Sequence, residues 1–247
     1  GNINGTSLSY SSPTTFLSGS TPGATSTTYD STNHKFVIAY NDSNSSQYYG
    51  KAVVCSVVGG SANSAGAPSV GVPVTFNYSF TMYPVATFDS TNNYVIIAYK
   101  DSNNNGRGMA CTGTVSSSSI TFNTYDEFIS SGVNYIAISY DSSNQKVIIA
   151  YSDVSNANYG TAIDGDVSNS GITFGTPVTF TVDSIQHTSL AYDSANNKTT
   201  VSYMNAGNSG YGEASVLTPS SSSTNLTASN FIGFSDGAYT NGQTAKV

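Results

Sequence analysis

The side chains best suited to binding chemistry are tyrosine, asparagine and aspartate residues in four short polar segments. Each segment follows an apolar run, such as residues 147–151, and ends at a glycine preceded by tyrosine or arginine. Aromatic faces with nearby amide groups suit sugars, which need stacking and directional hydrogen bonds. The alternative is that these rings pack on neighbouring sheets with their hydroxyls in solvent. The candidate ligand-binding residues are Tyr49, Arg107, Tyr159, Tyr211, Asn44, Asn103, Asn156 and Asn208.

Three of the four segments begin with an aspartate, namely Asp42, Asp101 and Asp153. Oxygen-rich loops of this kind could bind calcium, although they lack the dense alternating acids of known calcium loops. The fourth segment begins with Asn205 and has no acid there. The alternative is that these side chains close the loops by hydrogen bonds to the backbone. Calcium is the one cofactor for which the sequence offers candidate ligands.

The sequence predicts a protein that is not an enzyme. Glycosidases place two carboxyl groups on either side of the scissile bond. Glu127 and Glu213, the only glutamates, occupy different positions in the pattern. Asp164, Asp166 and Asp183 are among the aspartates that stand outside the repeated pattern. His34 and His187 are isolated and lack metal-ligand spacing.

A repeated motif determines how these residues must be positioned. An aromatic residue, an aspartate and a serine recur at Asp30, Asp89, Asp141 and Asp193, at intervals of 59, 52 and 52 residues. A period in this range indicates a solenoid, propeller or array. The four repeats start near residues 25, 84, 136 and 188.

Each repeat reads as four short antiparallel strands. In the third copy these are residues 137–140, 147–151, 159–167 and 177–180. The second is continuously apolar, which favours a strand buried on both faces. A glycine followed two residues later by alanine opens the third strand in every copy, which indicates a crowded position. We expect an all-β fold, a β-propeller of four four-stranded blades, with a β-sandwich as the rival.

The two ends of the repeated region differ from the middle. Residues 1–16 match only the end of a repeat and form a spare outer strand, whereas the fourth copy lacks one. If residues 8–16 pair with the strand near Ala214, four blades close into a ring; the alternative is a longer array. The propeller would cover residues 1–218. Residues 219–247 read as a tail with a β-hairpin or a link, since Asn241-Gly242 favours a tight turn.

Composition excludes several classes of partner. The 247 residues carry seven Lys and Arg and a net charge of −7, which disfavours nucleic acid and anionic membranes. No apolar run approaches the roughly 18 residues of a membrane-spanning helix, so we expect no membrane insertion. Cys55 and Cys111 are expected to be small buried residues rather than a disulfide.

The repeat consensus resembles repeats in virion and tail proteins of marine bacteriophages, notably cyanophages. The shared patterns are aromatic-Asp-Ser-x-Asn, Val-Ile-Ile-Ala-Tyr-x-Asp, Asn-x-x-Tyr-Gly-Thr-Ala and Gly-Ile-Thr-Phe-Gly-Thr-Pro-Val-Thr-Phe. Residues 230–238 are similar to a segment that often follows such repeats.

The resemblance implies a non-enzymatic virion surface or tail fibre protein with a host-adhesion role. It would lie on the virion surface or outside the cell, and its partners would be other assembly subunits and host-surface glycans. Two alternatives stay open. One is a carbohydrate-binding propeller of the lectin type. The other is an extracellular fibre or surface-layer subunit that joins protomers through the residues after Pro219.

Overall fold

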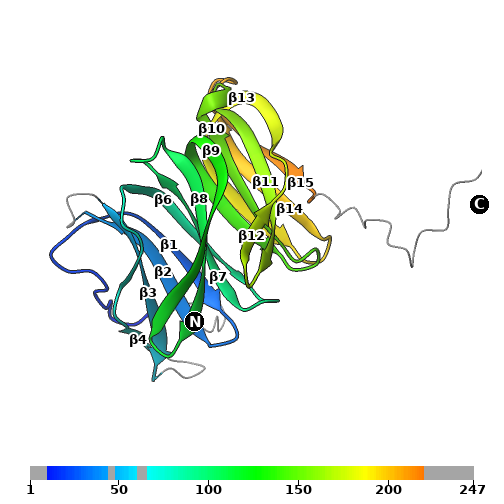
Figure 1. Ribbon diagram of the computed structural model, residues 1–247. Helices are drawn as coiled ribbons and strands as arrows, with labels where there is room; N and C mark the ends of the chain where they lie inside the picture. Colours follow the sequence, from blue (N-terminus) through cyan, green and yellow to red (C-terminus); the bar gives the residue numbers. More distant parts are fainter. Residues whose placement is uncertain (1–9, 44–47, 60–65, 220–247) are drawn as a thin grey trace, which may run out of the picture.

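Antiparallel β-strands make up nearly all regular structure in the described part of the chain. The computed structural model describes residues 10–43, 48–59 and 66–219 (Figure 1). Within these ranges the only helix is a three-residue 3-10 turn, η1 (Val154–Asn156), so no described helix is long enough to cross a membrane. The predicted all-β, antiparallel class is confirmed.

The strands form two hydrogen-bonded sheets of five and ten strands, which divide into four antiparallel units. The first unit contains β1 (Pro22–Asp30), β2 (Lys35–Asp42), β3 (Tyr49–Val58), β4 (Ala67–Val70) and β5 (Val74–Asn77). The second contains β6 (Thr81–Asp89), β7 (Tyr94–Asp101), β8 (Arg107–Ser116) and the first part of β9 (Ser119–Asp141).

The second, third and fourth units share strands. The third unit contains the rest of β9, β10 (Lys146–Asp153), β11 (Tyr159–Ser168), β12 (Gly171–Phe174) and the first part of β13 (Val178–Asp193). The fourth contains the rest of β13, β14 (Lys198–Asn205) and β15 (Tyr211–Leu217). Because β9 and β13 each pair in one unit and then in the next, these three units form the ten-stranded sheet.

Each repeated aspartate closes the first hairpin of its unit. The buried Asp141 carboxylate accepts hydrogen bonds from the backbone N–H groups of Ser143 and Asn144 and from the Asn144 amide, at 3.0, 3.0 and 2.8 Å. Asp30, Asp89 and Asp193 make the same three bonds. The repeat is therefore a turn motif in which the aspartate mimics a backbone acceptor.

The central strand of each unit supplies most of the core. All eight residues of β10 are buried, as the continuous apolar run predicts. Full burial of one Val or Ile side chain contributes about 1.5–3 kcal/mol. β14 is weaker, because Lys198 and Ser202 are exposed. The fourth unit is thus covered well on one face only.

A glycine, a phenylalanine and a tyrosine connect each unit to the next, and we call this set the Gly–Phe–Tyr joint. The ring of Phe180, on the outer strand of the third unit, occupies the space where a Cβ on Gly160 would lie. The same ring contacts Tyr203 of the fourth unit, at 5.3 Å between centroids. Equivalent joints are Gly50–Phe76–Tyr99 and Gly108–Phe128–Tyr151. The predicted crowding at the strand-three glycine is confirmed at these three joints.

The predicted ring closure by the N-terminal segment is wrong for the described residues. Residues 10–16 form no strand, and Phe16 packs instead against Tyr40 of the first unit at 5.3 Å. Among the described strands, β15 pairs with β14 alone. Figure 1 shows why: the first unit, in blue, and the fourth, in yellow to orange, lie at opposite ends of the molecule. The aromatic contact therefore holds the segment away from Ala214.

The two cysteines are free and buried, as predicted. Burial raises the pKa of both thiols. Burial also raises the pKa of Tyr40 to about 12, with the Asp42 charge adding to the effect, so the Phe16–Tyr40 contact stays neutral. The predicted hairpin tail lies outside the described residues, except for Pro219.

A matched pair of glycine variants tests the joint. Gly160→Val should destabilise the protein by about 1–3 kcal/mol, because the new side chain overlaps the Phe180 ring. Gly212→Val should leave stability unchanged or slightly higher, since nothing lies within 4 Å of its Cβ position and valine favours strands. Urea unfolding followed by circular dichroism measures both. If both variants changed the free energy of unfolding equally, the proposed role of Gly160 in the joint would be contradicted.

Candidate functional site

The predicted ligand-binding residues lie at the loop ends, the hairpins that lead from the second to the third strand of each unit. The strand register places four pairs at equivalent positions: Asp42 opposite Tyr49, Asp101 opposite Arg107, Asp153 opposite Tyr159 and Asn205 opposite Tyr211. The structure therefore distributes these candidates one set per unit. Asn103 and Asn156 are exposed on their loops, and Asn44 lies outside the described residues.

The loop-end aspartates attach the hairpin to the segment that enters the unit. The Ser20 hydroxyl donates to Asp42 at 2.6 Å, and Ser79 donates to Asp101 at the same distance. Ser131 is 3.3 Å from Asp153. In the fourth unit the roles are reversed, because the Asn205 amide donates to Asp183 at 2.8 Å.

These bonds favour a structural role for the predicted calcium ligands. Across residues 10–43, 48–59 and 66–219, no three His, Cys, Asp or Glu side chains are grouped so that they could hold a metal ion. Serine also substitutes poorly for the several carboxylate and carbonyl oxygens that calcium requires. The calcium site stays a prediction, and the contacts give it no support.

In the first three units, residues of or next to the outer strand contact the loop-end side chain and cover part of it. Tyr49 makes an edge contact with Tyr78, at 5.6 Å between ring centroids. Arg107 forms an ion pair with Glu127 at 2.5 Å. Tyr159 is half-buried beside β13. These residues are therefore less accessible than the sequence alone indicates.

The fourth loop end has both an exposed ring and a fixed polar group. The Tyr211 side chain is 63% exposed. Two residues away, the Glu213 carboxylate accepts hydrogen bonds from Asn205 at 3.0 Å and Asn208 at 2.9 Å, and from the Tyr203 hydroxyl at 3.2 Å. The bonds from Asn205 and Asn208 are the main causes that hold the pKa of Glu213 below its usual value. This loop end provides a stacking surface beside an ordered acceptor.

A row of rings crosses three units at their first strands. Tyr83 and Tyr135 lie 5.6 Å apart, and Tyr135 and His187 lie 5.2 Å apart, between ring centroids. All three residues have left-handed φ values, of 50°, 50° and 52°, which is unusual for bulky side chains. Each precedes the repeated aspartate by six residues, and this constant offset is the sequence signal that could have identified them. The first unit has Ala24 at this offset, so the row ends there.

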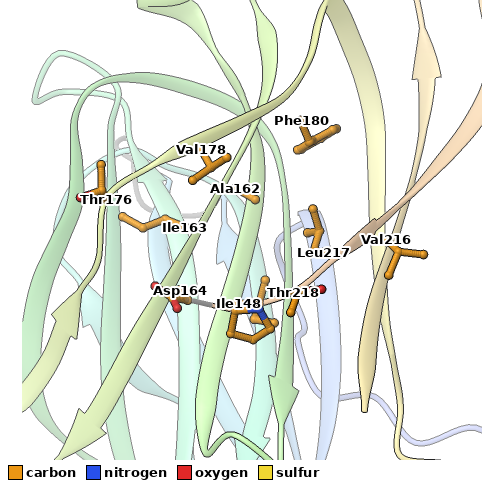
Figure 2. Close-up of a pocket in the computed structure, with 11 residues that line it drawn as sticks. Ile148, Ala162, Ile163, Asp164, Thr176, Val178, Phe180, Val216, Leu217 and Thr218 are labelled. Atoms are coloured by element: carbon orange, nitrogen blue, oxygen red, sulfur yellow. The ribbon is translucent and has the colours of Figure 1, made fainter. Parts of the chain in front are cut away.

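The acids outside the repeat are held by ion pairs or amides. Lys146 contacts Asp166 at 2.9 Å and Asp164 at 3.6 Å. Asp164 also lines a pocket of about 250 Å³ between the third and fourth units, where Ile148, Val178 and Leu217 supply apolar surface (Figure 2). Because one lysine contacts both carboxylates, the pair suits a structural role better than acid and base catalysis.

The pKa of Glu213 tests the order of the fourth loop end. A depressed carboxyl pKa means that the charged form persists below pH 4.5, the ordinary value. Stability from this network is therefore present above pH 4.5 and is lost as the pH falls through the lower folded pKa. Carbon-detected NMR titration should give a midpoint below 4.5, and Asn208→Ala should raise it. Asn103→Ala, on another loop, is the control. An ordinary midpoint in the unmodified protein would contradict the network.

No protein-family model and no curated protein matches the chain. Among solved structures, a variant of AofleA from Arthrobotrys oligospora with three arginines replaced by alanine has a TM-score of 0.51 at 10% identity; the match covers 80% of this chain and 54% of that one. An exo-β-1,3-galactanase from Phanerochaete chrysosporium, solved with β-1,3-galactotriose, has a TM-score of 0.45 at 11% identity, over 69% and 41% of the two chains. The chain thus spans about half the length of the structures it resembles.

Proposed function

We propose that this protein is a non-enzymatic carbohydrate-binding module. The observation that carries the proposal is the fourth loop end, where the exposed Tyr211 ring lies beside the Glu213 network. Saccharide recognition combines an aromatic platform with a few ordered hydrogen-bonding groups. The ring would stack on the apolar face of a sugar, while Glu213 accepts from its hydroxyl groups and Asn208 offers its amide.

The charge of the protein narrows the ligand class. A net charge of −7 repels sulfated and uronic acid polymers, and Glu213 adds a local negative charge where the sugar would lie. The proposed ligands are therefore neutral glycans. The proposal includes no catalytic step; Glu127, Asp166 and Asp183 are held by Arg107, Lys146 and Asn205 respectively.

The four units support a propeller-type arrangement, in which each unit is a blade and the described chain is an open arc. This is our interpretation of the successive joints, since the two sheets do not close. The virion and tail assignment rests on the repeat resemblance, and so do the host-adhesion role, the assembly partners and the extracellular or virion location. An exposed glycan-binding module is compatible with each of them.

A single substitution tests the proposed sugar site. Tyr211→Ala should reduce affinity for a neutral glycan by about tenfold, or about 1.4 kcal/mol, since it removes the aromatic platform of the proposed site. Thermal stability should stay unchanged, because the ring is exposed. A glycan array on the purified chain would identify the ligand, and isothermal calorimetry would then compare the variants, with calcium and with chelator.

Tyr125→Ala is the matched control, because Tyr125 is 50% exposed but lies on an outer strand away from the loop ends. This variant should bind normally. An unchanged affinity in Tyr211→Ala would exclude the proposed site, and a protein that is folded but binds no neutral glycan would refute the function. Loss of binding in chelator would instead restore a role for calcium.

A further inference from the structure

The two ends of the described repeats hold complementary parts of the joint. At the start, Phe16 contacts Tyr40 with a centroid separation of 5.3 Å and an angle of 63° between rings, as the phenylalanines of the complete joints contact their tyrosines. At the end, Gly212 is exposed, and nothing lies within 4 Å of its Cβ position. The first end thus has phenylalanine and tyrosine, whereas the last has the glycine alone.

The sequence around Phe16 matches the outer strands that fill the internal joints. Residues 13–16 read Pro-Thr-Thr-Phe, beside Pro-Val-Thr-Phe at 73–76 and at 177–180. In the first and third units these residues pair with the strand that carries the glycine: Ala52 lies opposite Val74, and Ala162 opposite Val178. The same register on β15 would place Ala214 opposite Thr14 and Gly212 opposite Leu17.

β15 has an unpaired edge to which such a strand can add. The third strands of the first three units, β3, β8 and β11, each pair on both sides, whereas β15 pairs with β14 alone among residues 10–43, 48–59 and 66–219. Gly212, Ala214 and Val216 are exposed, while Gly50, Ala52 and Val54 in the first unit are buried. An unpaired strand edge is a template for an added strand, and the small residues leave room for the incoming ring.

We propose that β15 binds residues 13–17 of a second copy of this chain, so that copies join head to tail. A complete joint requires Phe16 and Tyr40 together beside Gly212, and Figure 1 places the first unit far from the fourth within one chain. A second copy brings both residues at once, without breaking the contact that already holds Phe16. Each added copy exposes a new β15, so association continues beyond a dimer until a ring closes or a filament grows.

Two variants test the joint from its two sides. Phe16→Ala removes the ring, and Gly212→Val fills its place without touching described atoms. Both should weaken association roughly thirtyfold or more, the size expected for an interface hot spot. Tyr10→Ala is the matched control, since Tyr10 is 90% exposed and precedes the segment. Sedimentation velocity over a range of concentrations measures the assembly of the full chain. Phe16→Ala also uncovers Tyr40 and could destabilise the chain. If Phe16→Ala proves unstable, the result for Gly212→Val decides the test.

Cysteine pairs identify the occupant. A mixture of Thr14→Cys and Ala214→Cys chains should form an intermolecular disulfide on oxidation, and Thr14→Cys mixed with Val57→Cys should not. A monomeric protein at every concentration would overturn the proposal. So would association that survives Gly212→Val, because another surface would then be responsible. A disulfide within one Thr14→Cys/Ala214→Cys chain at monomer mass would show that the segment binds its own β15. None of these outcomes depends on glycan binding, but a strand added beside β15 would also cover part of Tyr211, as outer strands do for Tyr49 and Tyr159, so assembly and glycan binding at this loop end would compete.

Discussion

The units can stack closely because one glycine in each of the first three units has no side chain. Where Gly50, Gly108 and Gly160 lack a Cβ, a phenylalanine ring enters the third strand and reaches the tyrosine of the next unit. The apolar central strands then pack face to face around these rings, as in the cluster that contains Val37, Ile97 and Phe76. Without this close approach, the doubly buried strands would have no partner for their second face.

Local features of the fold follow directly from the sequence. The turn at Asp141 needs only an aspartate and an asparagine at fixed spacing, because all its hydrogen bonds are made within four residues. The buried β10 needs only a continuous apolar run. Both could be predicted because their causes lie within one repeat. The segment at 13–16 matches the outer strands in sequence, but residues 10–16 form no strand in the structure. The predicted ring closure was wrong because closure depends on the angle accumulated over several units.

The candidate site was predicted less completely. Tyr211 and Asn208 were identified as candidate ligand-binding residues by their position in the repeat. The same position makes Tyr49 and Tyr159 equally strong candidates. Their different accessibility depends on whether an outer strand lies beside them, which is a tertiary property. In the sequence, Glu213 was noted only as a glutamate that belongs to no catalytic pattern. Its role as a hydrogen-bond acceptor could not be predicted, because its partners come from the preceding strand and loop. The row of Tyr83, Tyr135 and His187 was missed because no propensity rule expects tyrosine at a left-handed φ.

The break between the two sheets has a mechanical consequence. β9 and β13 run through their boundaries without interruption: the first part of each strand pairs within one unit and the rest within the next, so a continuous strand links the second, third and fourth units. Between β5 and β6 no strand is shared, and the boundary is crossed by a main-chain bond from the Thr81 N–H to the Tyr48 carbonyl and by side-chain bonds such as that from Asn41 to the Thr81 carbonyl. Side-chain packing around Phe76 and Tyr99 also holds this boundary, but no continuous strand does, so we expect it to be the weakest of the three boundaries between described units. Under tension, or early in thermal unfolding, the first unit would swing or detach before the other three come apart.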